Sequence, residues 1–218
     1  MKGLLVKDFE LVKVQKNFFI IIIIVALGIL ILGDNVTMPI GFLTFIMSLF
    51  TLSTISYDEF DNGNAFLFTL PITRQSYVLE KYGFGLILGV GAWFCITAVS
   101  MIVILIKQSM LPMDLLMMSC MFLPFTLFLQ AFMIPFQIEF GSEKGRIAIL
   151  GMFGLIFIVG ILIKQVAESI FHIDLLYLLD HLPQLDMSII IVSMIFIAMI
   201  LLWISSRISI AVMNKKEF

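Results

Sequence analysis

Six long apolar runs divide this chain of 218 residues, and they restrict its fold more than any other feature. A membrane-spanning helix needs about 20 mostly apolar residues, with a range of roughly 17–25. The runs cover residues 17–33, 38–56, 82–106, 115–138, 147–163 and 187–206. Hydrophobic residues make up 61% of the chain and charged residues 13%, whereas globular domains average about 45–50% and about 25%. We therefore expect an all-α integral membrane protein with six transmembrane helices in a single domain, residues 1–218.

Positive charge indicates the orientation of the predicted spans, because cytoplasmic loops retain lysine and arginine. With both termini inside, only Lys107 and Lys164 would lie outside. The inner segments would hold Lys2, Lys7, Lys13, Lys16, Arg74, Lys81, Lys144, Arg146, Arg207, Lys215 and Lys216. The sequence thus predicts cytoplasmic termini and a multi-pass protein of the cell membrane, with the bacterial cytoplasmic membrane as its expected location. Without a basic patch, we expect membrane lipids and no nucleic acid as partners.

Two further segments have helical spacing outside the spans. In residues 1–16, apolar side chains recur every three or four positions, while Lys7 and Asp8 lie elsewhere on the helical wheel. This pattern predicts a helix on the inner leaflet, or alternatively a ragged extension of the first span. Residues 165–183 have one mostly apolar face and predict a short outer helix at the membrane interface.

A polar segment, residues 57–81, separates the second and third predicted spans and is longer than a simple turn requires. It contains several acids, a turn signal at residues 61–64 and a short apolar piece at 65–70. A Leu-Pro step then disfavours helix, and Thr73 is a residue type that favours the N-cap of the next one. The pattern predicts a short cytoplasmic helix between two turns; the alternative is an ordinary surface loop.

The chain contains no motif that would make it an enzyme by itself. It lacks a Gly-x-x-x-x-Gly-Lys-Ser/Thr phosphate loop, so any ATP must be bound by another subunit. No acid lies near a predicted bilayer midplane, which disfavours an ion-coupled carrier. A metal site is suggested only weakly, because the pattern fits polar residues of an interfacial helix better; its candidates are His172, Asp174, Asp180 and His181.

Uncharged polar residues inside the spans are candidates for a translocation path. Thr44, Ser48 and Thr51 share one face of the second span, and Gln130 lies between two prolines in the fourth. Hydroxyl and amide groups also bond across ordinary helix contacts. Path lining and helix packing therefore both remain open for these four residues.

Segment 57–81 resembles the block that follows the second span in small permeases of the ABC-2 family. The similarity is carried by Tyr57-Asp58-Glu59, Thr69-Leu70-Pro71-Ile72-Thr73-Arg74 and Val78-Leu79-Glu80-Lys81-Tyr82, and the opening residues 1–9 are also similar. The resemblance implies the transmembrane subunit of an ATP-driven ABC exporter. It would pair with a second permease, identical or different, and with two copies of an ATP-binding subunit that hold ATP and Mg.

The same resemblance implies that the loop between spans 2 and 3 forms a coupling helix seated on the ATPase. The implied contact residues are Asp58, Glu59, Asn62, Phe66, Phe68, Leu70 and Arg74, with residues 139–146 as a second contact. Related permeases export antimicrobial or amphipathic peptides, such as those of the phenol-soluble-modulin type, so the expected cargo is an amphipathic peptide or other hydrophobic molecule. The alternative is a non-transporting membrane scaffold or sensor that recruits a cytoplasmic partner through this loop.

Overall fold

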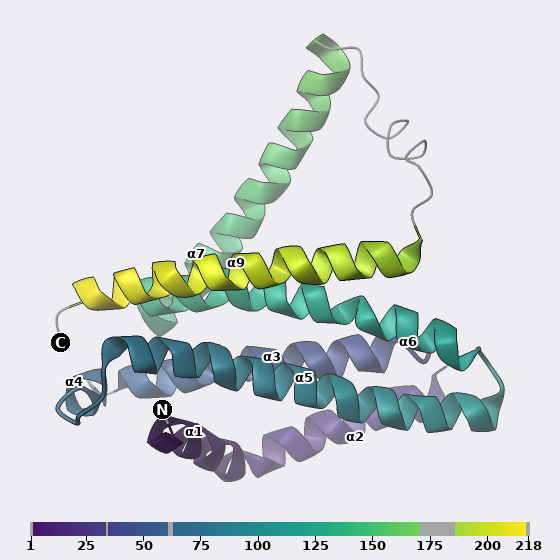
Figure 1. The fold of residues 1–218 in the computed structure, drawn as a ribbon, viewed down its shortest axis with the longest axis horizontal. Coiled ribbons are helices and arrows are strands. Elements are labelled where there is room, and N and C mark those ends of the chain that lie inside the picture. The colour runs from purple at the N-terminus through teal and green to yellow at the C-terminus, as the bar shows by residue number, and fades with distance from the viewer. Residues whose placement is uncertain (1, 34, 61–62, 171–185, 217–218) are drawn as a thin grey trace.

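Helices account for all the regular secondary structure in the part of the chain that the computed structural model describes, which is residues 2–33, 35–60, 63–170 and 186–216 (Figure 1). This follows from the apolar runs, since backbone polar groups inside a bilayer must be hydrogen-bonded within the protein. The helices are α1 (Lys2–Val14), α2 (Lys16–Leu32), α3 (Met38–Glu59), α4 (Gly63–Leu67), α5 (Arg74–Lys107), α6 (Pro112–Cys120), α7 (Phe122–Ile170) and α9 (Met187–Lys215).

Four stretches of the described chain are long and apolar enough to cross a membrane. They are Met38–Glu59, Arg74–Lys107, Pro112–Gly141 and Met187–Lys215. Helices α1 and α2 would add a fifth if the pair, which is bent by 69°, forms one span. The expected all-α membrane fold is thus confirmed, while the number of six spans and their orientation stay predictions.

The backbone of α7 changes direction at Gly141. Its φ of 74° lies in the region that glycine adopts at no steric cost. In Figure 1 the part of α7 before this residue lies within the bundle, and the part after it leaves the bundle. The predicted fifth span, residues 147–163, and the start of the predicted outer helix belong to this departing part. Residues 171–185, which include the rest of the outer helix and the four metal candidates, lie outside the described residues.

The polar connections gather at two opposite ends of the bundle. Helix α1, α4, the end of α9 and the break at Gly141 lie at one end, called the α4 end below (Figure 1). At the opposite end, the connection from α5 to α6 passes through Gln108, which has a left-handed backbone with φ 50°. Lys107 also lies there, and its Nζ donates to the carbonyl of Ile31 at 2.8 Å.

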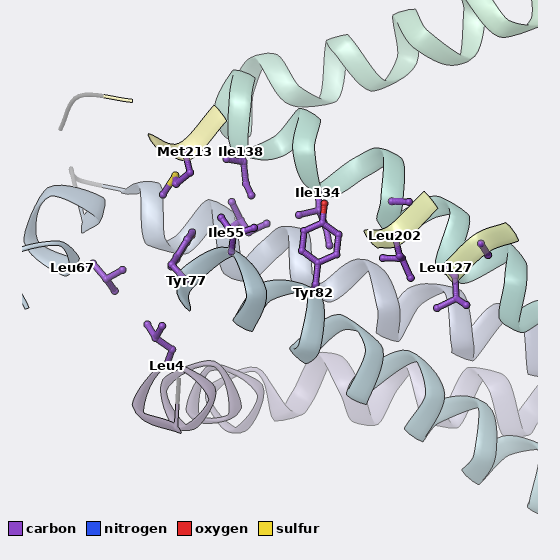
Figure 2. Close-up of a cluster of buried hydrophobic side chains, with 13 residues drawn as sticks. Leu4, Ile55, Leu67, Tyr77, Tyr82, Leu127, Ile134, Ile138, Leu202 and Met213 are labelled. Atoms are coloured by element: carbon purple, nitrogen blue, oxygen red, sulfur yellow. The ribbon is translucent and has the colours of Figure 1, made fainter. Parts of the chain in front are cut away.

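Two large hydrophobic clusters and one smaller one pack the described helices together. The core nearer the α4 end joins α3, α5, α7 and α9 through side chains that include Ile55, Val78, Ile134 and Met213 (Figure 2). Helix α1 contributes Leu4 to it. The other core, nearer the opposite end, packs α2, α3, α5 and α6, and its members include Ala26, Leu30, Ile40, Ile96, Ile104 and Leu115.

Candidate functional site

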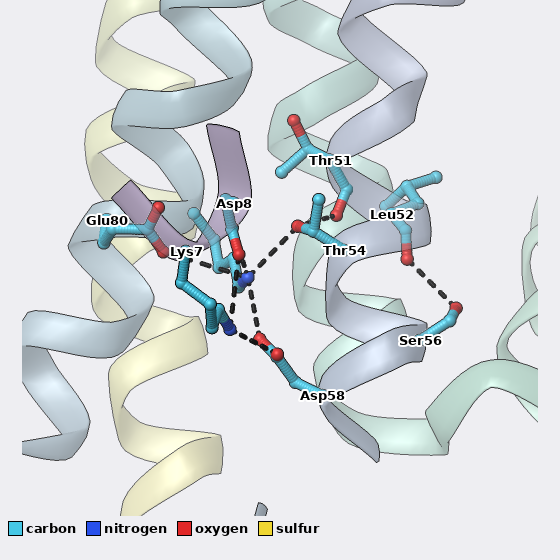
Figure 3. A network of polar contacts seen from close by, with 9 residues as sticks. Lys7, Asp8, Thr51, Leu52, Thr54, Ser56, Asp58 and Glu80 are labelled. Carbon is cyan, nitrogen blue, oxygen red and sulfur yellow. Dashed lines mark hydrogen bonds and ion pairs between the residues drawn. The ribbon is translucent and has the colours of Figure 1, made fainter. Parts of the chain in front are cut away.

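Two aspartates and two lysines form a closed ring of ion pairs at the α4 end (Figure 3). The Nζ atom of Lys81 lies 2.5 Å from Oδ2 of Asp8 and 2.8 Å from Oδ2 of Asp58. Lys7 pairs with Asp58 as well, and its Nζ lies 3.2 Å from Oδ1 of Asp8. The side chains of Asp8 and Lys81 are both 0% exposed. Such charges are tolerated in a protein interior only when they are paired.

The ring ties α1 to both ends of segment 57–81. Asp58 is in the last turn of α3, and Lys81 is in the second turn of α5. Lys81 also donates to Oγ1 of Thr54 at 3.1 Å. Burial works to lower the pKa of Lys7, but the charges and hydrogen bonds of Asp58 and Asp8 outweigh it and raise this pKa above its usual value. Lys7 therefore stays charged within the ring.

Apolar contacts hold α1 in the same place. The ring of Phe9 meets Phe84 of α5 edge-on, with centroids 5.3 Å apart. Leu5 and Val12 pack against a small core of Phe19, Phe50 and Phe84. These positions are the apolar face that the helical wheel predicts. Asp8 is nevertheless fully buried, so α1 contacts the bundle through a charged side chain as well as an apolar face.

The short helix α4 presents apolar side chains at the surface. Phe66 is 71% exposed and Leu70, three residues beyond α4, is 45% exposed. Phe60, which ends α3 and was not among the predicted contacts, is 73% exposed. Phe68 instead turns inward, with its ring 5.8 Å from that of Tyr77. An apolar surface on a polar connection is typical of a binding surface for another protein.

The base of segment 57–81 is braced by several contacts. Thr73 is the N-cap of α5, as predicted, and its Oγ1 accepts a hydrogen bond from the backbone N–H of Ser76 at 3.2 Å. Arg74 donates to the backbone carbonyls of Met213 at 3.0 Å and Asn214 at 2.7 Å, at the end of α9. Its guanidinium also lies 5.9 Å from the ring centroid of Phe68. The start of α5 and the end of α9 are therefore joined.

Glu59 connects three segments at the α4 end. Its carboxylate lies 3.6 Å from Nζ of Lys216, just after α9. An added Cβ on Gly141 would lie only 3.4 Å from Oε2 of Glu59, so the break in α7 is close to the end of α3. Of the seven predicted contact residues, Phe66 and Leu70 are thus exposed, and Asp58, Glu59, Phe68 and Arg74 make contacts within the chain. Asn62 lies outside the described residues.

The four predicted path residues are buried together in the middle of the bundle. Thr44, Ser48 and Thr51 of α3 are 0%, 3% and 1% exposed, and Gln130 of α7 is 5% exposed. Nε2 of Gln130 donates to Oγ of Ser48 at 2.6 Å. Gly85 of α5 packs directly against these side chains, because a Cβ at this position would lie only 2.7 Å from Oγ1 of Thr51. We call Ser48, Thr51, Gln130 and Gly85 the mid-bundle group.

Sequence reasoning did not find the ion-pair ring. Lys81 and Asp58 both belong to the block that resembles ABC-2 permeases, but Lys81 also pairs with Asp8, which is 73 residues away. Two residues so far apart in the chain leave no periodic pattern in a single sequence that would reveal their pairing. The usable signal was weak, because Asp8 is one of two acids, with Glu10, among the lysines and apolar residues of this helix. Among the described residues, no group of three or more His, Cys, Asp or Glu could hold a metal ion.

The helices and their composition define a multi-pass α-helical protein of the cell membrane. The chain belongs to the ABC-2 family of transporter proteins, whose sequence model matches residues 3–214. Members of this family are transmembrane components that typically work with ABC ATPase subunits. No curated protein and no solved structure matches the chain significantly.

Proposed function

We propose that this chain is the permease subunit of an ATP-driven exporter, and that segment 57–81 receives the force from a separate ATPase subunit. The observation that carries the proposal is the exposed apolar surface of Phe60, Phe66 and Leu70 on a braced connection. Exposed aromatic side chains that enter a partner's pocket dominate many interfaces. Family membership supports an ABC ATPase as the class of partner. We propose that two copies of it bind the permease pair and hold ATP and Mg.

The contacts at the base of the segment give a route for movement. A displacement of α4 acts on α3 through Asp58 and on α5 through Lys81, because the two side chains are paired at 2.8 Å. Arg74 carries the same displacement to the end of α9. In the proposed orientation, with both termini in the cytoplasm, all of these contacts lie on the side of the membrane where the ATPase would bind.

The proposed cargo is an amphipathic peptide or another hydrophobic molecule, exported by a pair of permease subunits with six spans each. In the conformation described, Thr44, Ser48, Thr51 and Gln130 are buried between helices of one subunit. If they line the path, α7 must separate from α3 and α5 during transport. A cysteine at Ser48 would then react with a water-soluble maleimide only while the ATPase turns over.

The docking role is tested with Phe66→Ala in the chain co-expressed with candidate ATP-binding subunits. Phe66 is 71% exposed, so its loss leaves the fold intact. We expect ATPase binding to weaken by roughly ten- to thirtyfold, which corresponds to about 1.4–2 kcal/mol for an interface anchor. Cargo-stimulated hydrolysis should fall with it.

Phe94→Ala is the matched control, because Phe94 is 67% exposed but lies within the apolar part of α5. It should leave ATPase binding unchanged. Phe68→Ala tests a different property, since Phe68 packs on Tyr77 and Arg74 and its loss loosens the segment itself. The docking role is wrong if Phe66→Ala binds and stimulates the ATPase as the unmodified chain does. An ATPase that binds but never responds to hydrophobic peptide or lipid would favour a scaffold.

A further inference from the structure

The charges of the buried cluster at the α4 end do not balance. The ring of Asp8, Asp58, Lys7 and Lys81 is neutral, because each aspartate contacts both lysines. A third carboxyl group, that of Glu80, adjoins the ring (Figure 3). If all five groups are ionised, the cluster has a net charge of −1, and the side chains of Asp8, Glu80 and Lys81 are fully buried while that of Lys7 is 32% exposed.

Glu80 lacks the contacts that stabilise the two aspartates. Its side chain is 0% exposed, and its Oε2 approaches Nζ of Lys81 only to 3.8 Å. Among the described residues, neither oxygen of Glu80 has a hydrogen-bond partner. A carboxylate in such a place is strongly disfavoured relative to its neutral acid form.

The charged groups that act most strongly on Glu80 belong to this cluster. Helix α1 supplies Lys7 and Asp8, α3 supplies Asp58, and α5 supplies Lys81. The phenol ring of Tyr77, one turn before Lys81, lies 5.2 Å from Nζ of that lysine. Both lysines are already bridged by two aspartates each, so Glu80 shares Lys81 at 3.8 Å and has no cation of its own among the described residues.

Three kinds of positive group could compensate Glu80. A metal ion is disfavoured, since no group of His, Cys, Asp or Glu in the described residues has the arrangement to hold one. A cationic side chain of a partner protein is excluded by the complete burial of the Glu80 side chain. A proton needs neither space nor further ligands, and neutral carboxylic acids at neutral pH are documented in buried sites.

We propose that the cluster binds one proton, held on the carboxyl group of Glu80, and that this proton keeps α1 docked against α3 and α5. Release of the proton to water leaves a buried carboxylate beside the ring and weakens the docking of α1. Because Asp58 and Lys81 lie at the two ends of segment 57–81, the stability of the contacts that hold this segment then depends on cytoplasmic pH. The protonation is a property of this chain alone and does not depend on the proposed ATPase.

Infrared spectroscopy of the purified chain in detergent tests where the proton is. At neutral pH the unmodified chain should show the C=O stretching band of a protonated carboxyl group, and Glu80→Gln should lack it. Exposed carboxyl groups are ionised under these conditions. Absence of the band from the unmodified chain, or its persistence in Glu80→Gln, would overturn the assignment.

The pH dependence of thermal unfolding gives a second, independent readout. The folded chain would bind one more proton than the unfolded chain, so its stability should fall as the pH rises through neutrality. The folding equilibrium should lose at most about tenfold per pH unit from this group. In Glu80→Gln this loss should disappear, because the amide imitates the protonated acid without titrating.

Glu10→Gln is the control, since the side chain of Glu10 is 57% exposed on α1, outside the buried cluster. It should keep the pH dependence of the unmodified chain. If Glu80→Gln does not fold, Glu80→Leu repeats the measurement with a side chain of similar size that cannot titrate. A stability that rises with pH in the unmodified chain, or an equal pH dependence in the Glu80 variant, would refute the proposal.

Discussion

Two buried polar groups in this molecule differ in charge and in position along the bundle. The ion-pair ring lies at the α4 end and contains two lysines and two aspartates. The mid-bundle group contains only hydroxyl and amide side chains around Gly85. Both use α3 and α5, but the ring adds α1 and the mid-bundle group adds α7. Helices α3 and α5 thus contribute to both polar groups, and each group joins them to one further helix.

The difference in charge determines which substitutions each group can tolerate. A buried ion that loses its partner keeps its full desolvation penalty, whereas a hydroxyl group can bond to its own helix backbone. Thr54 already does this, since its Oγ1 donates to the carbonyl of Thr51 at 2.9 Å. We therefore expect the ring to fail when one member is removed, and the mid-bundle group to fail mainly when its close packing is disturbed.

Lys81→Met should have the largest effect, because it leaves Asp8 and Asp58 with only Lys7 between them. Removing one member of a buried ion pair destabilises a protein by about 3–5 kcal/mol. We expect a large fall in the thermal unfolding midpoint in detergent, together with a low yield of monodisperse protein. Both are measured on the purified chain.

The double variant Lys81→Met with Asp8→Leu should recover part of this loss, since Lys7 and Asp58 then remain as one balanced pair. Lys107→Met is the control at the opposite end, where the ammonium group donates to backbone carbonyls instead of buried carboxylates. If Lys81→Met and Lys107→Met destabilise the chain equally, the ring has no special place in the fold.

Gly85→Ala should have an intermediate effect, because it disturbs packing without adding a charge. The new Cβ would lie 2.7 Å from Oγ1 of Thr51 and 2.9 Å from Nε2 of Gln130. Overpacking of this kind costs about 1–3 kcal/mol. In Gly91→Ala, on the same helix, the Cβ meets nothing within 4 Å. Equal unfolding midpoints for the two alanine variants would show that α3, α5 and α7 are less closely packed than described.

The sequence predicts the helices of this molecule better than the contacts between them. Apolar runs of 20 residues give strong local signals, and Thr73 marks the start of α5 through a cap that involves only its neighbours. The exposure of Phe66 is not a local signal of the same kind, since Leu67, the next residue of α4, is buried. The pairing of Asp8 with Lys81 depends instead on the bend of 69° between α1 and α2, which determines where α1 lies against α5. A helical wheel shows that Asp8 avoids the apolar face, but not that α5 provides a lysine there.

Gln130→Met should have the smallest effect, and it tests the comparison between the ion-pair ring and the mid-bundle group most directly. The variant removes the hydrogen bond from Nε2 to Ser48, but it also removes Oε1, which has no hydrogen-bond partner among the described residues. Because one favourable and one unfavourable feature disappear together, we expect a change within about 1 kcal/mol. Gln130→Glu keeps the size and introduces a carboxyl group far from the lysines of the ring, so it should be much less stable by the same unfolding measurement at alkaline pH, where that group must ionise. A loss for Gln130→Met as large as that for Lys81→Met would mean that charge is not what separates the two groups. The amide would then stabilise the contact of α7 with α3 through more than its one bond to Ser48.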